Sequence, residues 1–287
     1  MSEGAAPAQS PTEQFVKLLF DHVSDSPELH FFNTHLHLPH VQLPVLGEFQ
    51  VTRYMVLELI AAVLCMLILI PLARRTRPGV ASPGPFANFF EAIFVFLREQ
   101  VARPAIGHDS DHFLPYLCTA FFFILFCNLL GMIPFGGSPT GNLMVTGIMA
   151  LFTFGCVHGS GIKKMGVVEY IHSITPPVPK AVYPLVFFAE LIGHVTKTLA
   201  LAIRLFANIF AGHMVLTVLL GLIVLFLLMT QSAGLFVSVL VSLGTAVPSV
   251  LLVVALSLLE LFVGFLQAYV FTFLSALFIG MAVHPHH

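Results

Sequence analysis

The sequence predicts an all-α polytopic membrane protein, and three observations support this fold class. Only 9% of its 287 residues are charged and 57% are hydrophobic, whereas soluble chains carry about 25% charged residues. The mean hydropathy is +0.95. No Asp, Glu, Lys or Arg occurs between Phe113 and Ile162, and Glu260 is the only such residue from Leu205 to His287. Long uncharged apolar stretches are typical of membrane spans, so the composition excludes a cytosolic enzyme, a nucleic-acid-binding protein and a disordered tail.

We divide the chain into an extracytoplasmic N-terminal segment, residues 1–50, and a membrane domain, residues 51–287. Phe15 to Phe20 suggest one short amphipathic helix in the N-terminal segment. His, Leu and Pro alternate from His30 to Pro44, which favours an extended loop. No basic region precedes a long apolar run at the N-terminus, so a cleaved signal peptide is not expected.

The first part of the membrane domain predicts three spans and one surface helix. Spans are expected at about residues 54–72, 113–134 and 142–160. The apolar part of residues 86–101 is too short to cross and contains Glu91, so we expect an amphipathic helix lying in the plane of the interface.

Basic residues predict the orientation. Three arginines follow the first span within residues 74–77, and Lys163 and Lys164 follow the third. The two clusters fall on the same side only if residues 86–101 do not cross. The positive-inside rule favours that arrangement, which places the N-terminus outside and both clusters and the C-terminus in the cytoplasm.

The last apolar stretch runs from Val182 to Val283 and is interrupted near Gln231 to Gly234 and at Pro248. Hydropathy alone permits four short spans or two very long tilted helices, at about residues 182–229 and 233–283.

Four charged residues stand inside this apolar stretch. An ionised side chain at mid-membrane costs at least ~2.5 kcal/mol, and such residues usually mark an ion or substrate route. At about 100° per residue, five polar residues share one stripe of the first helix: Glu190, His194, Lys197, Arg204 and Asn208. His213 falls off that stripe. On the second helix, Ser249, Glu260, Gly264 and Gln267 form another.

The chemistry of these side chains suggests proton transfer. Arginine cannot give up its proton at physiological pH, whereas glutamate and histidine can pass protons along. The pattern therefore suggests two proton-relay segments separated by the fixed cation Arg204. The alternative is a structural ion pair between Arg204 and Glu260, although buried pairs rarely repay their desolvation by stability alone.

Two motifs resemble a known family. The run Leu199 to His213, LALAIRLFANIFAGH, and the run Gln267 to Phe271, QAYVF, with Glu260 seven residues before it, are similar to subunit a of the membrane sector of F-type ATP synthases of the bacterial type. The runs NLLGMIP, from Asn128, and SPTGN, from Ser138, also match.

The resemblance implies a function. Arg204 would be the essential cation that faces a rotating ring of c subunits and blocks a direct proton leak. The proton path implied by the two stripes and the family is His213, Glu260, Gln267, Asn208, Glu190, His194, Lys197 and Ser249. His213 and Glu260 match a pair in the family that often has the glutamate on the first helix and the histidine on the second. Polar positions toward the cytoplasmic opening correspond to Glu190 and, less closely, to His194 and Lys197.

The resemblance also implies an assembly. The last two helices would be long and steeply tilted against the ring. The chain would be a non-catalytic, proton-translocating subunit of the bacterial plasma membrane that contacts lipid, the c ring, the peripheral-stalk b subunits and the remaining synthase subunits. It implies no nucleic acid, cofactor or metal.

Two other functions compete. A proton-coupled secondary transporter would show repeated halves with broken helices, and the sequence shows neither. Histidines near both ends suggest a metal-ion transporter, because imidazole binds zinc and copper: His30, His35, His37, His40, His284, His286 and His287. No acidic or cysteine cluster accompanies them in a span.

Overall fold

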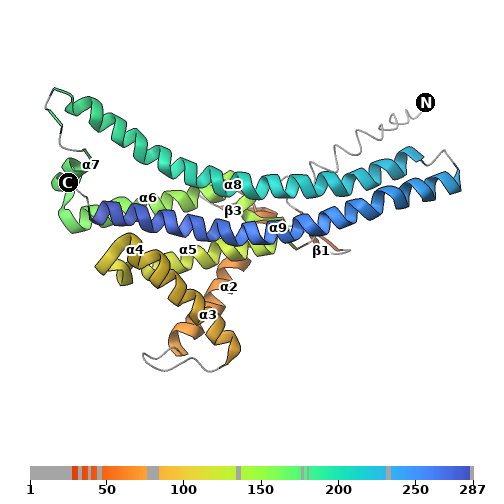
Figure 1. The fold of residues 1–287 in the computed structure, drawn as a ribbon, viewed down its shortest axis with the longest axis horizontal. Coiled ribbons are helices and arrows are strands. Elements are labelled where there is room, and N and C mark those ends of the chain that lie inside the picture. Colours follow the sequence, from red (N-terminus) through yellow and green to blue (C-terminus); the bar gives the residue numbers. More distant parts are fainter. Residues whose placement is uncertain are drawn as a thin grey trace.

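The computed structural model describes residues 28–31, 34–37, 40–43, 47–75, 84–133, 137–175, 178–179, 181–230 and 234–284. Five helices in this part of the chain are long and apolar enough to cross a membrane. The two longest occupy the C-terminal half (Figure 1). The predicted all-α polytopic fold class is therefore confirmed. The short helix expected from Phe15 to Phe20 lies outside the described residues.

Two antiparallel hairpins precede the helices, where the sequence favoured an extended loop. Strand β1 (Glu28–Phe31) pairs with β2 (Thr34–His37), and β3 (His40–Leu43) pairs with β4 (Gly47–Gln50). The backbone is extended as expected, but it also pairs with itself. The physical reason is the alternation of polar and apolar residues in these strands, which has the period of two that suits a β-ladder.

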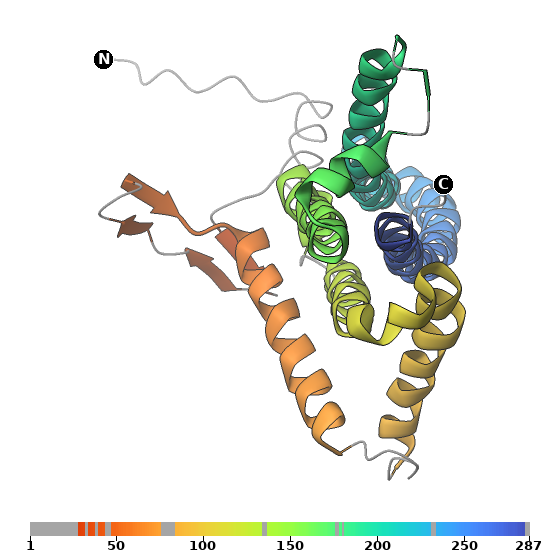
Figure 2. The same cartoon turned by 90° about the vertical axis from the view of Figure 1, so that its left-hand side faces the viewer.

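Helix α2 (Arg53–Arg75) leads to the helix expected at about residues 86–101. That helix begins as α3 (Pro85–Phe96), continues through a π-helical turn, η1 (Leu97–Ala102), and ends with α4 (Arg103–Ile106). Gly107 then adopts φ 80°, which glycine tolerates best, and the short turn η2 (Gly107–Asp109) changes the chain direction. In Figure 2, α2 and α3 project away from the remaining helices and approach each other at their far ends, as the two arms of a V. The in-plane position of α3 stays a prediction.

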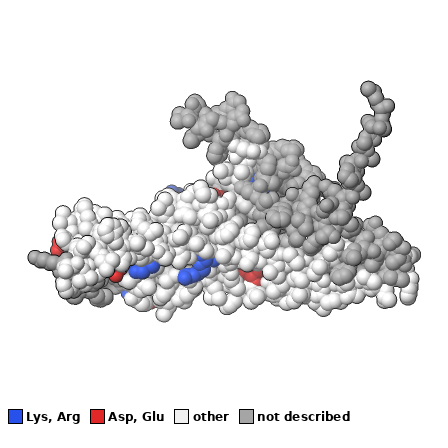
Figure 3. Space-filling view, turned by 90° about the horizontal axis from the view of Figure 1, so that it is seen from above, with Lys and Arg blue, Asp and Glu red and all other residues white. Residues whose placement is uncertain are grey.

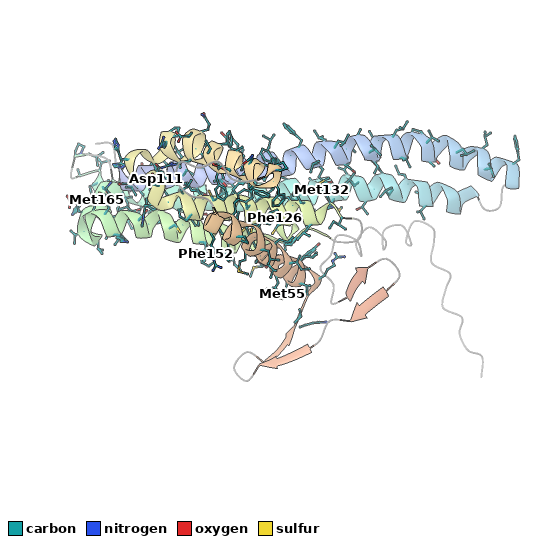
Figure 4. All side chains as sticks on the ribbon, turned by 90° about the horizontal axis from the view of Figure 1, so that it is seen from below. Met55, Asp111, Phe126, Met132, Phe152 and Met165 are labelled. Atoms are coloured by element: carbon teal, nitrogen blue, oxygen red, sulfur yellow. The ribbon has the colours of Figure 1, made fainter. Side chains whose placement is uncertain are left out.

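Helices α5 (Ser110–Gly131) and α6 (Leu143–Met165) form an antiparallel hairpin joined by η3 (Pro139–Gly141). Figure 4 shows Asp111, at the start of α5, and Met165, at the end of α6, toward the same end of the molecule. An ion pair of 2.6 Å between Lys164 and Asp109 joins these ends. The short helix α7 (Val167–Ile174) follows directly.

The C-terminal half consists of α8 (Tyr183–Thr230) and α9 (Leu235–Val283). Of the two arrangements that hydropathy permits, the structure has the two long helices. Pro248 lies inside α9 without ending it. The two helices run side by side (Figure 1), and α9 also packs against α5 and α6.

A phenylalanine-rich core joins the early helices to α9. The ring of Phe122 on α5 contacts Phe90 and Phe94 of α3, with centroids 5.5 Å apart in both pairs. Phe121 meets Phe265 of α9 edge to face at 5.6 Å. Such pairs add about 0.5–1.5 kcal/mol each beyond the burial of their area. The core thus holds α9 against α5 and leaves much of the opposite face of α8 and α9 open.

Candidate functional site

Arg204 lies on the exposed side of α8, near the middle of this 48-residue helix. Apart from Lys197 and Asn208, its neighbours on that side are small and exposed, among them Ala200, Ala207 and Ala211. Among the side chains that the structure describes, none forms a hydrogen bond or ion pair with Arg204. Figure 3 shows a largely uncharged surface with only a few blue and red patches. Arg204 is therefore a cation presented on an apolar surface.

The structure does not support an Arg204–Glu260 pair. Glu260 on α9 instead faces His213 on α8, with 3.9 Å between Oε1 and Nε2. The Glu260 side chain is 10% exposed, and Oε1 has no hydrogen-bond partner among the described atoms. Although His213 falls outside the polar stripe on α8, it reaches the partner helix. The structure thus brings together the two residues that the resemblance grouped.

Gly212 makes the approach of Glu260 possible. A Cβ atom at this position would lie 2.8 Å from Oε1 of Glu260, which is too close for an ordinary contact. The absence of a side chain therefore lets the carboxyl group lie directly against α8. It lines a cavity of about 240 Å³, together with Asn208, Gly212, Val215, Leu256 and Leu259. We call this the Glu260 cavity.

Gln267 lies seven residues after Glu260, on the same face of α9. It is buried, and its Nε2 has no hydrogen-bond partner among the described atoms. A buried amide nitrogen of this kind normally donates to a water molecule or to another polar group. Ser249 is half-exposed and lines neither this cavity nor the second one described below. At the helical rise of ~1.5 Å per residue, Gln267 lies about 10 Å and Ser249 about 16 Å from Glu260 along the helix axis.

A buried polar network fixes this part of α9. Asn128 of α5 donates from Nδ2 to the Gly264 carbonyl of α9 at 2.9 Å. Thr140 donates to Asn128 Oδ1 at 2.8 Å, and its hydroxyl lies 2.7 Å from that of Ser138. Asn128, Ser138 and Thr140 belong to the two supporting sequence runs. Their role in the structure is to hold α9 at Gly264, between Glu260 and Gln267.

The other end of the polar stripe forms a second cavity, of about 190 Å³. Glu190, His194 and Lys197 of α8 line it, as the stripe predicts. The opposite wall comes from α6, α7 and the end of α9: Thr153, Val157, His158, Tyr170, Ser173 and Phe278. We call this the His194 cavity.

Two residues of the His194 cavity were not identified from the sequence. The Tyr170 hydroxyl lies 2.7 Å from Nδ1 of His158, and the His158 and His194 rings are 5.3 Å apart. Burial raises the pKa of the Tyr170 hydroxyl, so it stays neutral. The sequence signal for His158 was a lone histidine in an uncharged apolar span. No sequence pattern pointed to Tyr170, because its helix α7 comes after the predicted span. Only the fold brings α7 back against α6.

The two cavities lie on opposite sides of Arg204 along α8. Lys197 is the last charged residue of the His194 cavity, and Asn208 is the first polar residue of the Glu260 cavity. These positions are about 10 Å before and about 6 Å after Arg204 at the helical rise of ~1.5 Å per residue. Each cavity has at least one titratable side chain in its wall. Two such cavities separated by a permanent cation can accept protons on both sides without a continuous path through Arg204.

The histidine-rich ends give no metal site in the described residues. Within them, no group of three or more His, Cys, Asp or Glu side chains could hold a metal ion. His286 and His287, and the side chains of His30, His35, His37 and His40, lie outside the part that is described.

Comparison with known proteins places the chain in one family. The family model described as ATP synthase A chain matches residues 55–280. The chain is 39% identical to ATP synthase subunit a 2 of Chlorobaculum tepidum over 97% of this chain and 76% of that protein. It is 38% identical to ATP synthase subunit a of Chloroherpeton thalassium over 93% of this chain and 77% of the relative. It is 40% identical to ATP synthase subunit a of Myxococcus xanthus over 84% of this chain and 75% of that relative.

Proposed function

This chain belongs to the ATP synthase A chain family, and from that premise we propose that it is the proton-conducting stator subunit of an F-type ATP synthase. It passes protons through two offset half-channels to and from carboxyl groups of a rotating c ring. Proton flow thereby turns the ring and drives ATP synthesis elsewhere in the complex. The chain itself is a multi-pass membrane protein with no catalytic centre of its own.

The observation that carries the proposal is the exposed Arg204, which has no hydrogen-bond or ion-pair partner among the described residues and lies between two cavities that each contain a titratable side chain. A cation on an apolar surface at mid-membrane is costly unless a partner neutralises it. The described residues supply no such partner, so we assign this role to a ring carboxylate. A positive charge beside a carboxyl group stabilises its ionised form. Arg204 therefore promotes the release of the proton from each ring carboxyl group that arrives next to it.

On the extracytoplasmic side, protons reach the ring through the Glu260 cavity. Glu260 and His213 exchange protons, while the amides of Gln267 and Asn208 hold water between them and the ring. We keep Ser249 as an outlying polar residue of this path. A proton delivered here neutralises a ring carboxylate, which can then turn into the lipid at low cost.

On the cytoplasmic side, the proton released beside Arg204 leaves through the His194 cavity. Glu190 and His194 carry it, and Lys197 adds positive charge at the end of the cavity that is nearer to Arg204. Arg204 stops a short circuit between the two half-channels because its guanidinium keeps its proton at physiological pH. Each proton that crosses contributes ~2.3 kcal/mol per 100 mV of membrane potential, so several must be coupled to each ATP.

The exposed apolar face of α8 and α9 is the proposed ring contact, with both helices steeply tilted in the membrane. The peripheral-stalk b subunits and the other synthase subunits contact the remaining surface. We place the protein in the bacterial plasma membrane, with the N-terminus outside and the C-terminus in the cytoplasm. Lys163 and Lys164 at the end of α6 support this orientation.

Purification of the tagged chain from native membranes tests the proposal. We expect a small two-helix proteolipid to accompany it in molar excess, since one stator faces a whole ring. Purification from intact membranes without such a protein would contradict the stator function and favour a free-standing transporter.

A further inference from the structure

His158 is the feature that the proposed function leaves unused. It lies on α6, faces the His194 cavity, and points one ring nitrogen at Tyr170. Its other nitrogen, Nε2, is buried and has no hydrogen-bond partner among the described atoms. A buried imidazole nitrogen without a partner is rare in a structural role, because it loses its hydrogen bond with water and gains nothing.

We propose that His158 is a proton relay of the cytoplasmic half-channel, which accepts and releases protons at Nε2 while Tyr170 holds Nδ1. This inference rests on the proposed function, since the half-channel is part of that function. It adds a residue from α6 to a path that otherwise runs along α8.

Tyr170 is the positioning residue. Its ring packs directly over Gly161, one helical turn after His158 on the same helix, where a side chain on Gly161 would collide with it. Its hydroxyl remains neutral and lies 2.7 Å from Nδ1. When Nδ1 carries hydrogen and donates it to this hydroxyl, the lone pair of Nε2 is free to bind a proton. Tyr170 therefore fixes the ring orientation, and its hydroxyl can accept from Nδ1–H in the tautomer that leaves Nε2 free for a relay.

The proton step is a reversible protonation. Nε2 is buried in this structure, so a small movement must first open it to the cavity. A proton released at the ring then passes through water in the cavity to Nε2, and His158 becomes an imidazolium whose Nδ1–H still points at Tyr170. The same N–H bond at Nε2 then breaks, and the proton goes to water nearer the cytoplasm. The cavity volume of about 190 Å³ has room for several waters at roughly 30 Å³ each.

The groups around His158 favour the onward transfer of a proton over its retention on the imidazole. The His158 and His194 rings are 5.3 Å apart, so two imidazolium charges would repel and the pair holds one proton more readily than two. Lys197 also opposes a lasting positive charge, whereas Glu190 attracts one. The end of α9 contributes only apolar side chains to this wall: Phe278, Met281 and Ala282. A proton on either histidine is therefore easily displaced.

The test uses inverted membrane vesicles that contain the complete synthase, so that the cytoplasmic face meets the bulk solution. His158→Gln keeps the size and a hydrogen-bonding group but cannot titrate. We expect ATP-driven pumping to fall about three- to tenfold, with the larger loss above pH 7, where protons are scarce and a collecting group matters most. Tyr170→Phe keeps the packing on Gly161 and should lose less. His172→Gln on α7 is the matched control, because His172 lies outside the cavity, and its rate and pH profile should not change.

Chemical rescue separates a relay from a structural role. Added imidazole should restore much of the rate of His158→Ala and leave the unsubstituted complex unchanged, measured with a potential-sensitive dye that buffering does not disturb. Loss of pumping with an unaltered pH profile and no rescue would overturn the relay, as would a normal rate in His158→Gln. If Arg204→Ala abolishes pumping while His158→Gln does not alter it, the relay alone fails. Normal pumping in Arg204→Ala would overturn the proposed function itself.

Discussion

His213 and Glu260 face each other across the α8–α9 pair, with Nε2 3.9 Å from Oε1. This separation is too long for a direct hydrogen bond and short enough for strong mutual influence in a poorly solvated site. The two groups belong to different helices and are 47 positions apart in the chain. They meet because Gly212 lets the carboxyl group lie against α8. A pair with this spacing can exchange a proton after a small movement or through one water.

Arg204→Ala should abolish ATP-driven proton pumping and coupled ATP synthesis while the complex still assembles. Arg204 is exposed, so its removal leaves no cavity in the core, but nothing then ionises the ring site or blocks the leak. Pumping in inverted vesicles measures the first effect, and passive proton conductance the second. Lys163→Ala, which removes an exposed cation of α6 that lines neither cavity, is the control and should retain the pumping. Normal pumping by Arg204→Ala would refute the assignment.

Glu260→Ala and His213→Ala should each slow proton translocation by a smaller factor, roughly ten- to a hundredfold, which corresponds to about 1.4–2.8 kcal/mol of activation free energy. Water can enter the enlarged cavity and replace one titratable group in part. The double variant should be slower than either single one but not proportionally so, because the two groups act together. An unchanged rate in the double variant would remove both residues from the proton path.

Gly212→Ala should also slow translocation, by displacing the Glu260 carboxyl group. The added Cβ would lie 2.8 Å from Oε1, so Glu260 must move away from α8 and from His213. Gly193→Ala is a close control on the same helix, because a Cβ there meets nothing within 4 Å. We expect at least a fivefold loss of pumping for Gly212→Ala and none for Gly193→Ala. Equal rates would mean that the close approach of Glu260 has no functional importance.

The sequence predicted the features that depend on local pattern. Long uncharged runs give long helices, and the 100° periodicity places Glu190, His194 and Lys197 on the wall of one cavity. It could not choose between two long helices and four short spans, because Pro248 interrupts the pattern of α9 without breaking the helix. Packing along α8 and α5 stabilises this continuous helix beyond its own propensity.

Contacts between segments that are distant in the sequence could not be predicted from the local pattern. The angular position of His213 separated it from the stripe, yet the crossing of α9 brings Glu260 to it. His158 and Tyr170 meet only because α7 turns back on α6 over Gly161. Ser249 shows the converse: it shares the angular position of Gln267, but helix length separates it from both cavities. Angle alone does not define a site on helices of this length.

Asn128→Ala should weaken the attachment of α9 to α5 and lower the thermal stability of the purified complex. The change removes two buried hydrogen bonds, the one to the Gly264 carbonyl and the one from the Thr140 hydroxyl. Each such bond contributes about 0.5–1.5 kcal/mol net, so we expect the unfolding midpoint of the detergent-solubilised complex to fall by several degrees. Thr196→Ala is the control, because Thr196 bonds only within α8, to the Ile192 carbonyl on an exposed face. Because Gly264 lies between Glu260 and Gln267, pumping should fall together with stability in Asn128→Ala. A stable complex with normal pumping would show that the phenylalanine core alone holds α9 in place.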